Sequence, residues 1–81
     1  MLPGRDGLVK VRARFAGEAE VLVRVGQKVA GGQTLAVVEG DREIERLAVK
    51  TGGTIVEVAV QSGTDVDNGA LLVTVREFEE G

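Results

Sequence analysis

The segments VRVGQKVAGGQTLAVV (23–38) and VQSGTDVDNGALLVTV (60–75) decide the fold, because they are two copies of one pattern. Glycine, valine, glycine, leucine and valine follow one another at intervals of three residues in both segments, and the copies lie 37 residues apart. The matched positions are Gly26, Val29, Gly32, Leu35 and Val38 in the first copy and Gly63, Val66, Gly69, Leu72 and Val75 in the second. Neither copy can bury its apolar face alone. We therefore expect a quasi-twofold structure in which the two copies share one core.

The rest of the chain has the two-residue periodicity of β-strands. Apolar and polar residues alternate in 9–15, 19–25 and 56–60, which predicts strands with one buried and one solvent-facing side. Segments 35–38 and 70–73 are apolar on both faces. No segment predicts a long helix. An all-β barrel or sandwich is therefore expected. We assign no function to the cations of the first strand, Lys10, Arg12 and Arg14.

Glycines punctuate these strands and mark the expected turns. Glycine tolerates a positive φ that other residues avoid, so it is typical of tight turns. The glycines expected in structural turns are Gly26, Gly32, Gly53, Gly63 and Gly69. We assign them to folding and not to chemistry.

Composition excludes several classes of function. With 81 residues, we expect one domain over 1–78 with a core at about 8–76, followed by an acidic tail at 79–81. A net charge of −3 and only two aromatic residues argue against nucleic-acid binding. The absence of a long apolar run argues against a membrane span, and the start of the chain lacks a secretory signal, so a cytoplasmic location is expected.

Catalysis and metal binding are not expected either. The sequence has no cysteine, no histidine and a single serine, Ser62, in a predicted turn. Asp65 and Asp67 lie close together, but the further oxygen ligands of a calcium loop are missing. We therefore expect no metal, no small-molecule substrate and no enzymatic activity.

Between the two copies, residues 37–55 predict a β-hairpin. Val37 and Val38 precede a tight turn placed at Gly40 and Asp41, and apolar alternation then resumes. The predicted exposed tip, which is the candidate interaction site, consists of Glu39, Gly40, Asp41, Arg42 and Glu43.

Over about residues 19–76 the chain resembles the lipoyl domains of 2-oxo acid dehydrogenase acyltransferases and, more distantly, biotinyl carrier domains. The resemblance implies a barrel-sandwich hybrid, a flattened barrel of two quasi-twofold related four-stranded halves, with a hairpin that presents a modified lysine. Glu39, Gly40 and Asp41 match the residues that precede the lipoyl lysine. Biotinyl domains usually place methionines on both sides of their lysine, so the flanks resemble lipoyl domains more. Counted back without a gap from Gly53, the lysine position falls on Arg42.

Arginine at this position changes the functional expectation. Lipoylation and biotinylation form an amide on a lysine amine, and an always-charged, delocalised guanidinium cannot replace that nucleophile. Lys10, Lys28 and Lys50 lie outside the tip, and Glu43 stands where the family often has alanine. In place of the family's Ala-Pro the chain has Ala48, Val49 and Lys50. No prosthetic group is therefore expected on the sequence as written, although the resemblance implies a family that carries lipoyl, in preference to biotin.

Two readings of the charged tip follow. In the first, the domain is a non-catalytic interaction or assembly module that displays the tip to a protein partner, such as a multienzyme complex. The alternative is a lipoyl carrier domain of an acyltransferase whose lysine has been substituted by Arg42. Charged hairpin tips are also common as protection of exposed strand edges, so the charge alone does not choose between these readings.

Overall fold

The computed structural model describes residues 7–78, and these residues form eight strands without a helix. None of them therefore belongs to a helix that could cross a membrane. The strands are β1 (Leu8–Arg12), β2 (Gly17–Val21), β3 (Lys28–Val29), β4 (Thr34–Glu39), β5 (Ile44–Ala48), β6 (Gly53–Val58), β7 (Thr64–Val66) and β8 (Leu71–Glu77). The acidic tail expected at 79–81 lies outside the described residues.

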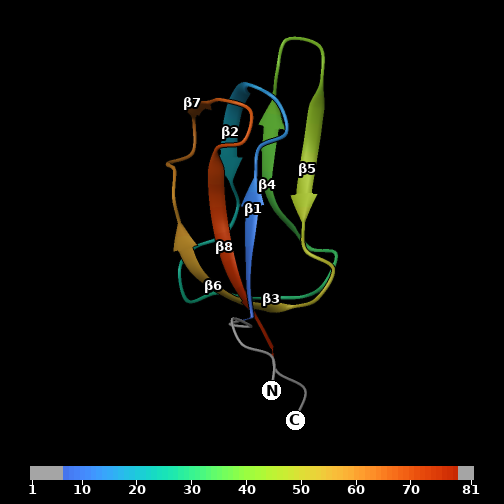
Figure 1. Ribbon diagram of the computed structural model, residues 1–81, viewed down its shortest axis with the longest axis vertical. Coiled ribbons are helices and arrows are strands. Elements are labelled where there is room, and N and C mark those ends of the chain that lie inside the picture. Colours follow the sequence, from blue (N-terminus) through green and yellow to red (C-terminus); the bar gives the residue numbers. More distant parts are fainter. Residues whose placement is uncertain (1–6, 79–81) are drawn as a thin grey trace.

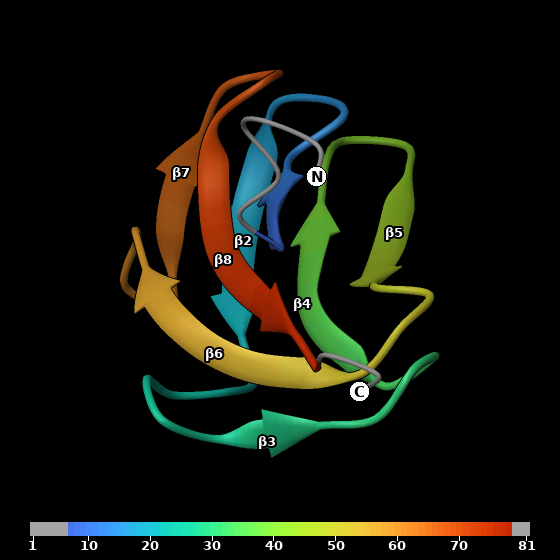
Figure 2. The same cartoon turned by 60° about the horizontal axis from the view of Figure 1, so that its bottom comes forward.

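The strands form two four-stranded antiparallel sheets, ordered β1-β8-β6-β3 and β5-β4-β2-β7 (Figures 1 and 2). Exchanging β1 to β4 for β5 to β8 converts the order of one sheet into that of the other. Each sheet thus takes two strands from each half of the sequence, and neither half contains all four strands of a sheet. The expected all-β barrel-sandwich fold and its shared core are confirmed.

The glycines of the repeat have the conformation that only glycine adopts readily. Their φ angles are 92° and 85° at Gly26 and Gly32, and 89° and 90° at the equivalent Gly63 and Gly69. All four donate a backbone hydrogen bond to the opposite half of the chain. The acceptors are the carbonyls of Ile55, Val49, Ala19 and Ala13, at 2.7, 2.8, 2.8 and 2.8 Å. These turns therefore join the two halves as well as reversing the chain.

Gly53 differs from this group, because it is the first residue of β6 and has no positive φ. A Cβ at Gly53 would lie 2.2 Å from the carbonyl oxygen of Arg76 on β8. The expectation of a turn at Gly53 is wrong: glycine is required there because two backbones approach closely. Gly17 has the same role in the other sheet, where a Cβ would lie 2.5 Å from the carbonyl oxygen of Glu39.

A β-bulge in β6 changes the spacing of the repeat. Ile55 pairs with Val75 and Glu57 with Thr74, so Val56 is an extra residue without its own partner. Up to Ile55 the equivalent residues of the two halves are 36 apart, as Ala19 and Ile55 are; beyond the bulge they are 37 apart.

Two expected burials are wrong, one of them because of this bulge. Alternation predicted that Val56 faces inward, but it is 37% exposed, while Ile55 is fully buried. Val25, at the end of another alternating segment, is 60% exposed because it stands in the turn before Gly26. Thr74, the buried polar residue of the described core, donates a hydrogen bond to Glu57 beside the bulge (2.9 Å).

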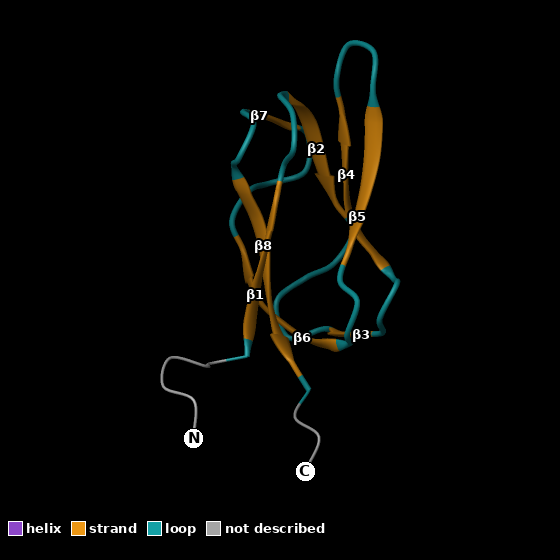
Figure 3. Cartoon of the chain, turned by 45° about the vertical axis from the view of Figure 1, so that its right-hand side comes forward, coloured by secondary structure: helices purple, strands orange, loops and turns teal. Residues whose placement is uncertain are grey.

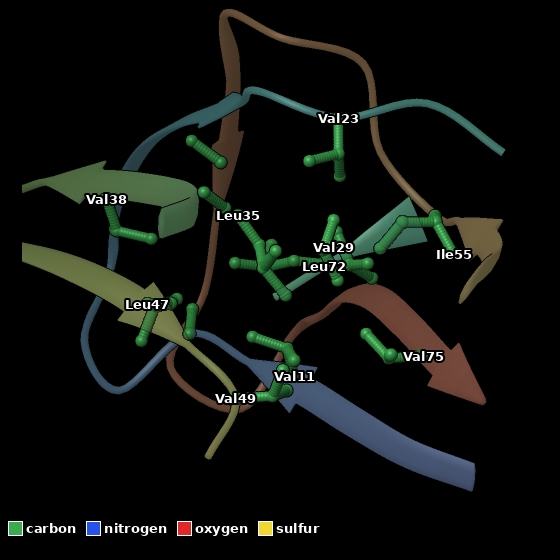
Figure 4. Packing of buried hydrophobic residues seen from close by; sticks show 14 of the residues in the cluster. Val11, Val23, Val29, Leu35, Val38, Leu47, Val49, Ile55, Leu72 and Val75 are labelled. Atoms are coloured by element: carbon green, nitrogen blue, oxygen red, sulfur yellow. The ribbon is translucent and has the colours of Figure 1, made fainter. Parts of the chain in front are cut away.

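The core lies between the two sheets and consists of aliphatic side chains from both halves (Figure 4). Leu35 and Leu72, which are equivalent in the repeat, are both fully buried, and so are Ala19 and Ile55. Substituting a leucine of this kind by alanine lowers the free energy of unfolding by about 2–5 kcal/mol in other proteins. The apolar positions of the repeat thus supply the stability of the fold.

Candidate functional site

The hairpin between β4 and β5 projects beyond the rest of the barrel, at the end opposite to the start of β1 and the end of β8 (Figures 1 and 3). Glu39 pairs with Ile44, and the Gly40 amide donates a hydrogen bond to the Glu43 carbonyl at 2.8 Å. Asp41 and Arg42 are therefore the two central residues of the turn. The turn expected at Gly40 and Asp41 lies one residue further along the chain.

Neither Asp41 nor Arg42 has a positive φ. Any L-amino acid, lysine included, can adopt this backbone without the strain of the left-handed region. Glu39, Asp41, Arg42 and Glu43 are exposed, whereas Gly40 is half-buried. The apex thus presents side chains to solvent on a backbone that does not restrict which residues stand there.

The connection between β1 and β2 supports the base of the hairpin. A Cβ at Gly40 would lie 3.0 Å from the Ala16 carbonyl oxygen and 3.1 Å from Cδ1 of Phe15, so the Phe15 ring packs against the turn. Arg14 Nε lies 3.6 Å from Glu45 Oε2. Since the Arg14 side chain is 76% exposed, this ion pair contributes only about 0–1 kcal/mol. Because this ion pair is weak, the hairpin is held mainly by the contact of Gly17 with the Glu39 backbone and of Gly40 with Phe15 and Ala16.

A hollow beside the hairpin is lined mainly by carboxylates. It lies between the hairpin, the start of β2 and the end of β7, and Arg42 is the cation among its lining residues. The acidic residues that line it are Glu18, Glu39, Asp41, Glu43, Asp65 and Asp67. Within residues 7–78 no group of three such side chains is arranged to hold a metal ion.

The lysine amino groups lie on other parts of the barrel. Its three lysines are Lys10 in β1, Lys28 in β3 and Lys50 in the connection from β5 to β6. β3 lies at the opposite end of the barrel from the hairpin (Figure 1). The hairpin therefore offers a guanidinium at its apex and no primary amine, so its residues do not fit a group held by an amide to lysine.

Sequence reasoning did not identify the support of the hairpin. The alternation in residues 9–15 predicts only a strand position for Phe15 and gives Gly17 no role. The signal was present, because Gly17 and Gly53 are equivalent once the repeat is aligned with its one-residue insertion at Val56.

Comparison with known proteins agrees with this architecture. Residues 10–75 match the family described as "Biotin-requiring enzyme". The acetyltransferase component of the pyruvate dehydrogenase complex from Azotobacter vinelandii is 36% identical over 64 residues, which cover 75% of this chain and 10% of the relative. The biotin carboxyl carrier protein of acetyl-CoA carboxylase from Nostoc is 31% identical over 65 residues, covering 80% of this chain and 35% of the relative.

Among solved structures, a single-chain, multi-domain long-chain acyl-CoA carboxylase matches with a TM-score of 0.80 and 25% identity. The match covers 99% of this chain and 8% of the carboxylase. This chain thus spans only about a tenth of the acetyltransferase and carboxylase chains. On the family match over most of its length, the chain belongs to the biotinyl/lipoyl domain family.

Proposed function

We propose that this chain is a biotinyl/lipoyl-type domain that carries no prosthetic group and acts as a non-catalytic protein-interaction module through its β4–β5 hairpin. The observation that carries the proposal is Arg42 at the exposed apex of the turn. The sequence resemblance aligns Arg42 with the modified lysine of the family, preceded by the same Glu39, Gly40 and Asp41.

The chemistry of attachment supports the first half of this proposal. Lipoate and biotin are joined to these domains through an amide, which forms when a lysine amine attacks an activated carboxyl carbon. That attack needs a nitrogen lone pair, whereas the arginine guanidinium stays protonated and its nitrogens share the charge. Arg42 therefore provides no attachment point, and the remaining lysines lie elsewhere on the barrel.

The composition of the tip supports the second half. Arginine is enriched at energetically important interface positions, since its planar fork binds carboxylates in a bidentate manner. Ile44, two residues beyond Arg42, is 57% exposed. The hairpin therefore offers a cation and an apolar side chain close together. We place the partner in a cytoplasmic multienzyme assembly, because two relatives are named as parts of pyruvate dehydrogenase and acetyl-CoA carboxylase.

A second candidate function is a carrier domain in which Arg42 replaces a native lysine. The names of the relatives favour it, since they refer to a dihydrolipoyllysine residue and to biotin. In that case the hairpin would still be recognised by an attaching enzyme once the lysine is restored.

The first experiment measures intact mass. The protein is isolated from its native host, and recombinant protein is incubated with ATP and either a lipoate ligase with lipoate or a biotin ligase with biotin. We expect no added mass on the wild-type chain in either sample. Arg42→Lys tests whether the hairpin can be recognised, and Arg46→Lys, on an exposed position of β5, is the matched control.

Each outcome decides between the candidates. A lipoyl or biotinyl mass on the native protein would overturn the proposal, wherever the group is attached. Modification of Arg42→Lys but not of Arg46→Lys would show that the hairpin retains carrier recognition and would favour the second candidate. Two unmodified variants, both folded by circular dichroism, would favour the interaction module.

The second experiment tests the contact surface. Arg42→Glu is expected to abolish capture of the native partner from host extract, because it reverses the charge of the apex. Arg24→Glu, an equal charge change on the exposed loop between β2 and β3, should leave capture unchanged. Both variants should keep the wild-type melting temperature within a few degrees, since exposed substitutions change stability by about 0.5 kcal/mol or less. If Arg42→Glu still captures the same partner, the hairpin is not the interface.

A further inference from the structure

A second surface, which shares no lining residue with the turn of the hairpin, lies between the edge strands β1 and β5. β1 is at the edge of one sheet and β5 at the edge of the other, so each strand pairs on one side only. Both strands line one open cleft, here called the β1–β5 cleft. Its lining consists of residues 9–14, 47–50, 68–69 and 77.

The backbone along this cleft can accept another strand. In an antiparallel ladder, every second residue bonds to the neighbouring strand and the others direct their N–H and C=O groups away from it. The Glu77 amide donates to the Gly7 carbonyl at 2.8 Å, which makes Gly7, Val9 and Val11 the residues that bond to β8. The N–H and C=O of Lys10 therefore point to the open edge of β1.

The walls of the cleft are positively charged although the chain has a net charge of −3. The cations among its lining residues are Lys10, Arg12, Arg14 and Lys50, against one carboxylate, Glu77. Arg12 donates a hydrogen bond to the Gly69 carbonyl (3.1 Å), and Arg14 pairs with Glu45. Lys10 and Lys50 form no ion pair with any residue of 7–78. The cleft thus has the opposite charge to the carboxylate-lined hollow beside the hairpin.

The floor of the cleft is apolar. Val9, Val11 and Ala13 alternate with the cations of residues 10–14, and the opposite wall contributes Leu47 from β5 and Val49 from the connection that follows it. Val11 and Val49 contribute to the buried core and also line the cleft (Figure 4). A strand added along β1 would therefore meet cations on one of its faces and aliphatic side chains on the other.

We propose that the β1–β5 cleft binds an extended segment of a partner protein, added as a strand along β1, in which acidic residues alternate with small apolar ones. Directly opposed side chains of neighbouring strands lie about 4.5–5.5 Å apart at Cβ, so alternate acidic side chains of the segment reach Lys10 and Arg12, the cations of β1. The intervening apolar side chains face Val11 and Val49. Main-chain hydrogen bonds give such a complex its affinity, and the alternating side chains give it its specificity. This site is separate from the hairpin contact and does not depend on it.

The test uses a fluorescent peptide of about eight residues, a typical strand length, with alternating glutamate and valine. Fluorescence anisotropy at low salt should give saturable binding to the full chain. Replacing every glutamate by glutamine should weaken binding at least about 10-fold, and replacing it by lysine should abolish it. Lys10→Gln combined with Lys50→Gln removes one cation from each wall of the cleft and should weaken binding of the glutamate peptide by about 3- to 10-fold.

Three controls make the test specific. Alternate N-methylation of the peptide, on the amides that would face β1, removes donors without changing charge and should abolish binding. Arg42→Glu should leave peptide affinity unchanged, which separates this site from the hairpin. Amide chemical shifts should change in β1 and at residues 47–50.

Several results would overturn the proposal. Equal binding of the N-methylated and parent peptides would show that no strand is added. Equal displacement by heparin or by anionic vesicles, with Arg24→Gln as harmful as the lysine variant, would identify general attraction to polyanions. Shift changes centred on residues 39–43 would place the peptide at the hairpin instead.

Discussion

Residues 17–39 and 53–76 form equivalent strands, β2 to β4 and β6 to β8, and their interiors match closely. Leu35 and Leu72 are both fully buried, and so are Val73 and its equivalent Ala36. Backbone hydrogen bonds are matched as well: Leu22 donates to Leu35 and Ala59 to Leu72, at 2.9 and 2.8 Å. The requirements of the fold are thus met twice, once in each half.

The match ends at the hairpin. The hydrogen bond from Gly40 to Glu43 has its equivalent in the bond from Glu77 to Gly7, both 2.8 Å long. Beyond the first bond the chain continues through Asp41 and Arg42, whereas beyond the second lie separate parts of the chain, before Gly7 and after Glu77. Asp41 and Arg42 therefore have no equivalent residues in the other half, which forms the same strands without such a turn. This difference separates the scaffold from the candidate site.

The largest effect on stability is expected at Gly17 and Gly53, the two equivalent glycines at which neighbouring backbones approach closely. Gly53→Ala and Gly17→Ala should each lower the free energy of unfolding by about 1–3 kcal/mol, as overpacked sites do. The reason is that the new Cβ would lie 2.2 Å from the Arg76 oxygen in one sheet and 2.5 Å from the Glu39 oxygen in the other. Urea unfolding followed by circular dichroism measures both variants.

Gly26→Ala is the control for this pair. Its Cβ would meet no atom within 4 Å, so only its φ of 92° opposes alanine, at a cost of about 1 kcal/mol. Wild-type stability of Gly53→Ala would contradict the close approach of β6 and β8. A difference of more than about 2 kcal/mol between Gly17→Ala and Gly53→Ala, a large fraction of the stability of a small domain, would show that the two sheets are not equivalent.

Much of the fold could be predicted from the sequence because few other residue types fit the turn and core positions of the repeat. The three-residue spacing from Gly26 to Leu35, found again from Gly63 to Leu72, identified both the left-handed turns and the buried positions. Strand alternation in residues 9–15 placed Val11 and Ala13 in the core correctly.

The errors have physical causes that a single strand does not reveal. The bulge at Val56 depends on how β6 pairs with β8, and it moved the buried face from Val56 to Ile55. Gly53 was expected in a turn because the sequence does not distinguish a glycine required by a close neighbouring backbone from a glycine required by a positive φ. The expected turn lies one residue too early, because a two-residue turn that contains glycine is a favoured hairpin connection, whereas Gly40 precedes the turn and makes room for Phe15. The candidate residue Arg42 was named from the resemblance, but its place at the centre of the turn required the pairing of β4 with β5.

The smallest expected effect tests a surface position at which the halves differ. Ser62 and Val25 are equivalent in the repeat, but only the serine hydroxyl binds the chain: it accepts from the Val21 amide at 2.7 Å and donates to the Val21 carbonyl at 3.0 Å. Ser62→Ala should therefore cost about 0.5–1.5 kcal/mol, the net contribution of such bonds. Val25→Ala should change stability by about 0.5 kcal/mol or less, since Val25 is 60% exposed. Equal effects of the two substitutions in urea unfolding would mean that the Ser62 bonds contribute nothing beyond those made with water. A larger loss at Ser62 would show that the second half holds β2 by a contact that the first half does without, so that surface positions, unlike the core, are free to diverge between the copies.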